Sequence, residues 1–427
     1  MATVAVFGTW HLGSVTAACL ADLGNRVLAT DLDLGTVAGL REGRPPIAEP
    51  GLAELIAKGL ASGRLSIHAP DDPALGFADI LYLAADTTVD DDDRVDLAFV
   101  EALAARAASL LQKEPLVVVH SQVPVGTTER LVATMAGQSG RALAAVHVPE
   151  NLRLGAAIEG FLRPDRLVVG SDTAAAADAV IALYGSLTCE VLRMSVRSAE
   201  MAKHALNGYL ATLISLASEL ADVCEATGAD AYDVERALRA DRRVSPKAPL
   251  RPGFGFAGGT LGRDVQTLRS LAAAHGLPSP LMDGVLSVNR RRGEHLLTRL
   301  RRELGGLEGK TIALLGLTYK PGTDTLRRSI ALEIGRDLLA AGAAVRAFDP
   351  MIAQLPAGAP AIALAADAES AALGSDALVI TTEWPEFAGL DWARLGAGMK
   401  RPLVFDVKGL LGAQVAGIEL RRMGVRS

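Results

Sequence analysis

The chain has 427 residues, of which 50% are hydrophobic and 22% are charged, a composition typical of a globular protein with two or three domains. Its formal net charge of −6 argues against a nucleic-acid partner, and its three cysteines are too few for a disulfide scaffold and lack metal-site spacing. The first residues show no basic segment or long apolar core typical of a signal peptide. We therefore expect a cytoplasmic protein without a metal or a membrane anchor.

In chain order, the first part alternates short β-branched runs with alanine-rich helical patterns. The runs are residues 4–7, 26–30, 80–84, 116–120, 144–148 and 166–169. This alternation predicts a parallel sheet covered by helices on both faces, an α/β domain that we place at residues 1–194. The acidic run 90–93 is expected to be a solvated loop.

Helix signals dominate the middle of the chain, which we place at residues 195–303, with Ser198 as a candidate helix cap. Its most apolar stretch, residues 205–223, is expected to be a buried helix rather than a membrane span, because it carries polar and charged side chains. From residue 304 to residue 427 a second α/β alternation follows, with runs at 311–316, 344–348, 377–381 and 403–406. The sequence thus predicts an α/β class with a helical connector between two α/β domains.

The first strand leads into a glycine turn and a helix start, the arrangement that binds the pyrophosphate of a dinucleotide. Gly8 allows the tight turn and Gly13 allows close packing of helix on strand, whereas Trp10 stands where a second glycine normally admits the pyrophosphate. His11 and Leu12 complete this loop, and His11 is expected to be a loop residue rather than a catalyst.

Asp31 stands 23 residues after Gly8, at the end of the second predicted strand. A carboxylate there accepts hydrogen bonds from the adenosine ribose and repels a 2′-phosphate, which favours NAD over NADP. The alternative is a Rossmann-like domain that binds no nucleotide or a different one.

Ordered motifs continue through nearly the whole chain. They are residues 43–52, 121–128, 149–153, 164–166, 200–207, 255–264, 316–327, 349–350, 382–387 and 406–409. With these motifs the sequence resembles the UDP-glucose/GDP-mannose dehydrogenase family. The resemblance implies two Rossmann-like domains joined by a long central helix and a helical dimerisation region. It also implies a homodimer that uses NAD to oxidise an alcohol of a nucleotide-diphosphate sugar.

The resemblance also implies roles for individual residues. The lysine and asparagine that match Lys203 and Asn207 stabilise the oxyanion, and they share one helix face because they are four residues apart. The aspartate that matches Asp264 positions a water or the lysine. The alternatives are that Lys203 is a surface residue and that Asn207 joins two helices.

The departures from the family concern the reacting centre. The family nucleophile is a cysteine, and the aligned residue here is Thr260, whose hydroxyl is a much poorer nucleophile than a thiolate. Gln122 replaces a threonine near the reacting carbon, and Asn151 replaces an aromatic residue after the retained Glu150. Arg263 and Lys408 exchange lysine and arginine relative to the family motifs. Buried structural thiols are the better interpretation of Cys19, Cys189 and Cys224.

Further binding residues follow from the same resemblance. Thr87, Ser121 and Arg327 are expected at the cofactor. The substrate is expected to meet the catalytic residues Lys203 and Asn207, the segment Glu150-Asn151-Leu152-Arg153, the basic residues Arg243 and Lys320, and the loop residues Phe254, Gly255 and Gly258. Guanidinium and ammonium groups suit a diphosphate, although each basic residue could equally be a surface charge.

Four functions remain open at this point. The missing thiol favours a two-electron oxidation that stops at an aldehyde or ketone. The retained Glu150 favours a four-electron route to a uronic acid without a thiol. An epimerase that retains NAD and a non-catalytic nucleotide-sugar-binding protein are the other two, and the retained Lys203 and Asp264 argue against the last.

Overall fold

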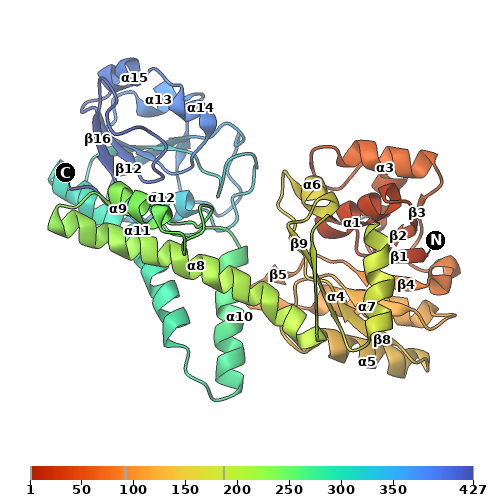
Figure 1. Cartoon of the computed structure of the whole chain (residues 1–427). Coiled ribbons are helices and arrows are strands. Elements are labelled where there is room, and N and C mark those ends of the chain that lie inside the picture. The colour runs from red at the N-terminus through yellow and green to blue at the C-terminus, as the bar shows by residue number, and fades with distance from the viewer. Residues whose placement is uncertain (1, 91–93, 186–187, 427) are drawn as a thin grey trace. The chain divides into compact units, whose positions relative to one another are not determined.

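A computed structural model describes residues 2–90, 94–185 and 188–426 of the chain, so most of the acidic run at 90–93 lies outside the described residues. The chain divides into two compact units, Met1–Leu206 and Asn207–Ser427 (Figure 1). The three-domain division at residues 194 and 303 stays a prediction.

The first unit is built on one eight-stranded sheet with the order β10-β9-β8-β7-β4-β1-β2-β3. The strands are β1 (Thr3–Phe7), β2 (Arg26–Thr30), β3 (Leu65–Ile67), β4 (Ile80–Leu83), β7 (Leu116–Val119), β8 (Ala144–His147), β9 (Arg166–Ser171) and β10 (Glu190–Met194). All six predicted runs form strands. The expectation of a wholly parallel sheet is wrong, because β9 pairs antiparallel with β8. The strand pair β5 (Thr88–Val89) and β6 (Val95–Asp96) forms a separate antiparallel ribbon.

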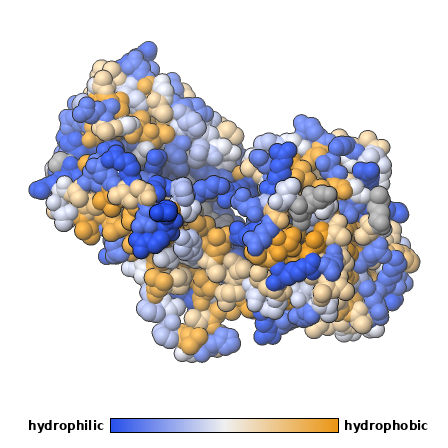
Figure 2. Space-filling view, in the orientation of Figure 1, coloured by the Kyte–Doolittle hydropathy of each residue, from blue (hydrophilic) through white to orange (hydrophobic). Residues whose placement is uncertain are grey.

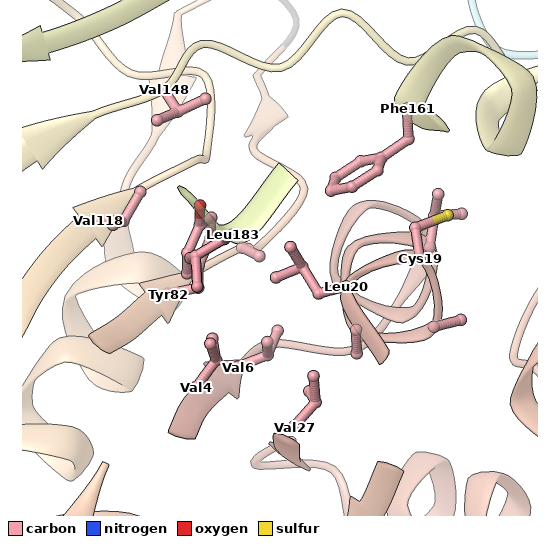
Figure 3. Close-up of a cluster of buried hydrophobic side chains, with 14 of the residues drawn as sticks. Val4, Val6, Cys19, Leu20, Val27, Tyr82, Val118, Val148, Phe161 and Leu183 are labelled. Atoms are coloured by element: carbon pink, nitrogen blue, oxygen red, sulfur yellow. The ribbon is translucent and has the colours of Figure 1, made fainter. Parts of the chain in front are cut away.

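Helices cover both faces of this sheet, as the alternation predicts. They are α1 (His11–Asp22), α2 (Leu34–Arg41), α3 (Leu52–Ala61), α4 (Ala98–Leu110), α5 (Thr127–Ser139), α6 (Ala157–Leu162) and α7 (Ala174–Ile181), with 3-10 turns η1 (Pro73–Phe77) and η2 (Ala182–Tyr184). Alternate side chains of β1 enter different cores, since Val4 and Val6 pack with α1 whereas Ala5 and Phe7 pack with α4 and α5. Figure 3 shows the first of these cores, where Val4 and Val6 face Leu20.

The long helix α8 (Val196–Thr227) contains the stretch expected to be a buried helix. The helix is confirmed, but its full burial is wrong, because Tyr209, Leu216 and Val223 are 57%, 45% and 55% exposed. Ser195 rather than Ser198 acts at its start, since the Ser195 hydroxyl accepts the Ser198 N–H at 3.2 Å.

The second unit continues with helices and a six-stranded parallel sheet of order β13-β12-β11-β14-β15-β16. The helices are α9 (Ala231–Ala240), α10 (Thr260–Ala274), α11 (Pro280–Leu304), α12 (Ile330–Ala340), α13 (Ala368–Ala372), α14 (Pro385–Ala388) and α15 (Trp392–Gly398). The strands are β11 (Thr311–Leu315), β12 (Ala344–Phe348), β13 (Ala363–Leu364), β14 (Ala377–Ile380), β15 (Leu403–Asp406) and β16 (Glu419–Arg422). The four runs predicted here all form strands.

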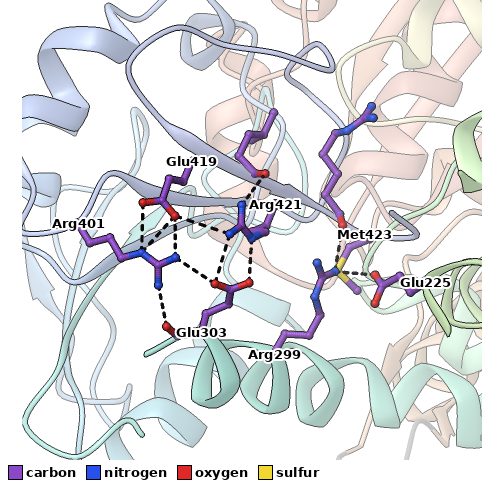
Figure 4. Close-up of polar contacts among 9 residues, drawn as sticks. Glu225, Arg299, Glu303, Arg401, Glu419, Arg421 and Met423 are labelled. Atoms are coloured by element: carbon purple, nitrogen blue, oxygen red, sulfur yellow. Dashed lines mark hydrogen bonds and ion pairs between the residues drawn. The ribbon is translucent and has the colours of Figure 1, made fainter. Parts of the chain in front are cut away.

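Ion pairs attach α11 to the last strands of this sheet (Figure 4). Glu303 near the end of α11 pairs with Arg421 at 2.8 Å and with Arg401 at 3.1 Å. Arg299, one turn earlier, pairs with Glu225 of α8 at 2.6 Å and donates to the Arg422 carbonyl. These pairs hold the helices that carry several site residues against their own sheet. Within the described residues, no helix is both long enough and apolar enough to cross a bilayer.

Candidate active site

The glycine turn after β1 has the geometry that the sequence predicts. Gly8 adopts φ +88°, which favours glycine, and its N–H donates to the Thr30 carbonyl at 3.0 Å. A Cβ on Gly13 would lie 1.6 Å from the Gly8 carbonyl oxygen, so α1 approaches the turn too closely for any other residue. Trp10 is the N-cap of α1 and is 50% exposed.

Asp31 lies directly after β2 and fastens this turn. One carboxylate oxygen accepts the Thr9 N–H at 2.5 Å, and the other accepts the Asp33 N–H at 3.0 Å. The Thr9 hydroxyl also donates to the first oxygen at 3.4 Å, and the oxygen that accepts the Asp33 N–H has a further lone pair, so the group can still accept a ribose hydroxyl. The glycine turn and the carboxylate therefore fit the adenosine end of NAD.

The side chain of Asp86, a residue that the sequence reasoning missed, binds the first turn of α1. Its Oδ2 accepts the Leu12 N–H at 3.0 Å. Burial raises the pKa of Asp86 and the charge of Glu150 raises it further, whereas the N–H groups of Leu12 and His11 and the nearby His11 ring lower it. A carboxylate thus lies where the phosphates of a dinucleotide would accept the same N–H groups.

His11 points to a second buried carboxylate. Its Nε2 lies 3.0 Å from Oε2 of Glu49, and Glu49 also accepts the N–H groups of Gly155 and Ala157. His11 is the first residue of α1 and not a loop residue as expected, and its ring contacts Glu49, which binds the segment before α6.

An ion pair joins two of the predicted catalytic residues. Lys203 Nζ of α8 lies 3.3 Å from Oε1 of Glu150, which follows β8, and the two side chains are 9% and 17% exposed. Oε2 of Glu150 accepts the Leu152 N–H at 3.0 Å, which fixes the carboxylate. The neighbouring Asn151 and Arg153 are exposed.

Other predicted residues lie at the carboxyl ends of β4 and β7, which are neighbours in the sheet. The Thr87 hydroxyl donates to the Gln122 carbonyl at 3.0 Å, and Ser121 is fully buried with its hydroxyl 3.4 Å from the Leu83 carbonyl. His120 is also buried here; burial lowers its pKa, so its imidazole is neutral near pH 7. Its Nε2 has no hydrogen-bond partner among the described residues.

The start of α8 is fixed to the first unit by its own side chains. The Glu200 carboxylate accepts the N–H groups of Gly126 and Thr128 at 2.5 and 2.8 Å, at the start of α5. His204 lies with its Nε2 2.9 Å from the Val123 carbonyl oxygen. Lys203 stands between these two anchors, so its position against Glu150 follows from the buried face of α8.

In the second unit, Asn207 and Asp264 meet. The side-chain amide of Asn207 donates to Oδ2 of Asp264, and the two residues are 5% and 0% exposed. Arg263 Nε lies 3.7 Å from the other oxygen of Asp264. Asn207 is four residues after Lys203 in the same helix, so the two side chains leave α8 on the same face.

Thr260 is the first residue of α10 and is exposed. All three cysteines are free. Burial raises the pKa of the Cys19 thiol to about 12, and Cys224 is also buried. Cys189 is only partly buried, contrary to the expectation, because it precedes the edge strand β10.

Two glycines allow the loop before α10 to pack closely against neighbouring side chains. A Cβ on Gly255 would lie 2.2 Å from Oδ1 of Asn289, which accepts the Phe256 N–H and whose amide donates to the Phe256 carbonyl. Gly258 packs against the Tyr319 ring, and its N–H donates to the Arg328 carbonyl at 3.3 Å.

Arg328 adopts φ +52°, the one positive φ outside glycine among the described residues. Such a conformation costs about 1–3 kcal/mol and is found mostly at functional sites. The segment before Arg328, which contacts the loop before α10, also carries two of the predicted binding residues, Lys320 and Arg327. Lys320 lies with Nζ 5.7 Å from the centre of the Tyr319 ring, and the Arg327 guanidinium lies 3.8 Å from the position of a Gly259 Cβ.

The remaining predicted residues of this unit are Phe254 and Arg243. Phe254 is buried in the core of the second sheet. Arg243 is exposed and pairs with Asp241 at 2.7 Å. Its side chain therefore does not join the other predicted site residues of the second unit. Within the described ranges, no group of three or more histidine, cysteine or acidic side chains has a metal-binding arrangement.

A second glycine turn follows β11 in this unit. Gly316 adopts φ +94°, and Oδ2 of Asp349 after β12 accepts the N–H groups of Leu317 and Thr318 at 2.6 and 3.0 Å. Nε1 of Trp384 donates to the same oxygen at 3.1 Å. This turn repeats the arrangement of Gly8, Thr9 and Asp31, so the fold contains two Rossmann-like domains.

Such a fold with a dinucleotide turn and a buried lysine–carboxylate pair defines the class of nucleotide-dependent dehydrogenases. Three models of the UDP-glucose/GDP-mannose dehydrogenase family match the chain: the NAD binding domain over residues 2–188, the central domain over residues 197–291 and the UDP binding domain over residues 313–413. The chain belongs to this family. The prediction of an NAD-dependent oxidoreductase is thereby confirmed.

Named relatives and a solved structure are similar to this chain over nearly its whole length. The chain is 37% identical to UDP-glucose 6-dehydrogenase of Pseudomonas aeruginosa, covering 95% of this chain and 93% of the relative. It is 36% identical to UDP-glucose 6-dehydrogenase of Rhizobium meliloti, covering 95% of each. Among solved structures, UDP-glucose dehydrogenase of the archaeon Pyrobaculum islandicum matches with a TM-score of 0.88 and 32% identity, covering 100% of this chain and 98% of that one.

Sequence reasoning missed Asp86, Glu49, Glu200, Asn289 and Arg328 as residues that shape these sites. A signal existed for Asp86, because it follows the buried strand β4 at the sheet edge where the glycine turn also lies. Glu49 and Glu200 lie within the motifs 43–52 and 200–207, but their partners are far away in the sequence. Asn289 and Arg328 lie outside the motifs, and the sequence offers no local sign of them.

Proposed function

We propose that this chain oxidises one alcohol group of a nucleotide-diphosphate sugar by two electrons, with NAD, and releases an aldehyde or ketone. The observation that carries the proposal is the arrangement on α8. Lys203 is held by Glu150, and one turn later Asn207 is held by Asp264. A buried cation and an amide on one helix face, each with a carboxylate partner from another element, are the groups that an alcohol oxidation requires.

Each group has a role that follows from its chemistry. The hydroxyl proton must leave as the carbon loses hydride, and the Glu150 carboxylate is the acceptor that we assign. The ammonium of Lys203 and the amide of Asn207 donate to the oxygen as negative charge develops on it. Asp264 holds the Asn207 amide in place and is itself fully buried. When bound, NAD supplies the hydride acceptor.

The limit to two electrons rests on Thr260. A second oxidation through a thioester needs a thiolate to attack the aldehyde, and the threonine hydroxyl is far less ionised than a thiol at neutral pH. Cys19 and Cys224 are buried, and Cys189 lies beside the edge strand β10. The chain thus lacks an evident replacement for the missing nucleophile.

The substrate is a UDP-sugar in this proposal. Support comes from the match of residues 313–413 to a UDP binding domain and from relatives named UDP-glucose 6-dehydrogenase. The proposed contacts are Lys320, with Gly255 and Gly258 of the glycine loop and the segment 150–153, whereas Phe254 belongs to the core. The proposed cofactor contacts are those of the first glycine turn with Thr87, Ser121 and Arg327. We place the reaction in the cytoplasm.

The working unit in this proposal is a homodimer built on α8. Met201, Tyr209, Leu216 and Val223 follow one another at intervals of eight, seven and seven residues, and each is 38–57% exposed. Such spacing forms an apolar stripe along one helix face, as in paired helices. Figure 2 shows apolar side chains on the surface of the α8, α10 and α11 region of the second unit. Size-exclusion chromatography with light scattering tests this, and a monomer would refute it.

The experiment for the site is the Lys203→Ala variant of the full chain. UDP-glucose and other UDP- and GDP-sugars are screened with NAD, and NADH absorbance reports oxidation. Lys203→Ala should lower kcat by at least about 100-fold, since it removes the group that stabilises the developing oxyanion. The matched control is Lys58→Ala, because Lys58 is 69% exposed and pairs with Asp22 at the surface. Equal turnover of the two variants would contradict the assigned site.

Thr260→Cys tests the limit to two electrons. If position 260 faces the reacting carbon, the added thiol should raise the NADH formed per sugar from one toward two. A variant that leaves this ratio unchanged and is alkylated equally fast with and without substrate would show that Thr260 lies elsewhere.

A further inference from the structure

Asp86 is a charged group that the proposed chemistry does not use. It follows β4 through two buried alanines and accepts the Leu12 N–H in the first turn of α1 at 3.0 Å. The N-terminal turn of this helix is where free N–H groups and the helix dipole attract the phosphates of a dinucleotide. The same N–H cannot serve Asp86 and a phosphate equally well, so the carboxylate and the pyrophosphate compete for one position.

We propose that Asp86 controls cofactor binding by occupying the pyrophosphate position of the first glycine turn, so that NAD binds when the carboxylate is protonated or turned away. The proposal rests on NAD binding by this domain and not on which sugar is oxidised or by how many electrons. Asp86 is thus a residue that sets the strength and the pH dependence of cofactor binding.

The rest of the turn supports this assignment. Trp10, the N-cap of α1, makes no capping hydrogen bond through its side chain within the described residues. The first turn of α1 contains no acidic residue of its own. The acceptor for the Leu12 N–H therefore comes from Asp86, 74 residues further along the chain, which a helix that only needed a cap could obtain locally.

Burial is the main cause that favours protonation of Asp86, and the charged groups around it act in both directions. Glu150, after β8, adds negative charge nearby, and its partner Lys203 on α8 neutralises part of it. His11 on α1 faces Asp86 but is paired with Glu49 at 3.0 Å. Burial raises the pKa of Asp86, so the neutral acid is reached at a higher pH than for an exposed aspartate.

The sign of the pH effect follows from this competition. Protonation removes the negative charge from the helix start, and the neutral acid can donate its proton to a phosphate oxygen. Because NAD selects the protonated form, binding takes up a proton, and the Kd for NAD falls as the pH is lowered. One linked proton limits this change to about tenfold per pH unit.

The experiment measures the Kd of NAD for the full chain between pH 5.5 and 8. Trp10 is a built-in reporter, because it is 50% exposed in the turn whereas Trp384 and Trp392 are buried. At pH 8, Asp86→Asn should bind NAD about tenfold more tightly than the wild type, which equals about 1.4 kcal/mol, and its Kd should no longer depend on pH. ADP-ribose, which carries the pyrophosphate, should gain as NAD does, whereas adenosine should not.

Asp72→Asn is the matched control. Asp72 is also a carboxylate that accepts an N–H at a helix start, from Ala74 at 2.9 Å, and it lies in the same unit. This variant should keep the wild-type Kd and pH dependence. His11→Gln assigns the titrating group, because His11 faces Asp86; it should retain the pH dependence.

Three outcomes would overturn the proposal. In the first, Asp86→Asn lowers the melting temperature and leaves the Kd for NAD unchanged, as for a purely structural cap. In the second, the pH dependence survives in Asp86→Asn and disappears in His11→Gln. In the third, Asp86→Asn tightens adenosine binding as much as NAD binding. A failed sugar oxidation with the expected NAD titration would refute the proposed function alone.

Discussion

The two glycine turns, one in each unit, are alike in their backbone and differ at the helix that follows. Gly8 and Gly316 both adopt a positive φ directly after the first strand of a sheet, at +88° and +94°. In both turns, a carboxylate that follows the second strand, Asp31 or Asp349, accepts N–H groups of the turn. The chain therefore uses one solution twice for the local problem of turning from strand to helix.

The difference lies in how the N–H groups of the next helix are satisfied. Ser329, the N-cap of α12, accepts the Leu332 N–H and is a local cap. In α1 the acceptor is Asp86, which comes from another strand. The comparison teaches that α12 begins with a permanent structural cap, whereas α1 begins with a group that a ligand can replace.

Breaking the shared turn should have the largest effect. Gly13→Ala would place a Cβ 1.6 Å from the Gly8 carbonyl oxygen, and neither backbone segment can move away without disturbing β1 or α1. We expect a loss of at least about 3 kcal/mol in the free energy of unfolding, measured by urea denaturation of the first unit within the full chain.

Gly137→Ala is the control for that variant. Gly137 lies in α5, and a Cβ there would meet nothing within 4 Å among the described residues. The substitution should stabilise the protein by about 0.5–1 kcal/mol, because alanine is the better helix former. Equal effects of the two substitutions would show that the close approach at Gly13 is absent in solution.

The two carboxylates that accept N–H groups of the turns, Asp349 and Asp31, should contribute unequally to the free energy of unfolding. Asp349→Asn sets an amide against the N–H donors of Leu317, Thr318 and Trp384 and should cost about 2–3 kcal/mol. Asp31→Asn should cost about 1–2 kcal/mol, because Asp31 accepts fewer donors. Chemical denaturation followed by Trp384 fluorescence reports the first, and hydrogen exchange of the Thr9 amide reports the second. The reverse order would contradict the likeness that we draw between the turns.

Among the destabilising substitutions, the smallest effect should come from the local cap. Ser329→Ala removes one acceptor for α12 and should cost about 1 kcal/mol of stability. It should leave the Kd for NAD unchanged, since Ser329 belongs to the second turn. A change of more than threefold in that Kd would mean that the two turns do not differ in function as proposed.

Much of the fold could be predicted because it is encoded locally. The inner strands are short β-branched or apolar runs that the sequence predicts, namely β1, β2, β4, β7, β8, β9, β11, β12, β14 and β15. Of the missed strands, β3, β10, β13 and β16 lie at the edges of the two large sheets, and β5 and β6 form the separate ribbon. Edge strands are half-solvated and carry mixed side chains, such as Glu190 and Arg193 in β10, so periodicity does not reveal them.

The candidate site divides in the same way. Lys203 with Asn207, and Gly8 with Gly13, could be found because helix geometry and turn chemistry relate neighbouring residues. The partner of Leu12 could be found only in part, because the end of β4 points to the glycine turn but the sequence does not say which acidic residue after β4 reaches α1. The first sheet was expected to be parallel. The antiparallel direction of β9 depends on the connection between β8 and β9 rather than on the local sequence pattern of the strand.

The most direct test of the account is the ratio of NADH formed to UDP-sugar consumed by the wild-type chain, with the product identified by mass spectrometry. Thr260 in place of a nucleophilic thiol predicts one NADH per sugar and an aldehyde or ketone two mass units lighter than the substrate. Two NADH per sugar with a uronic acid as product would contradict it.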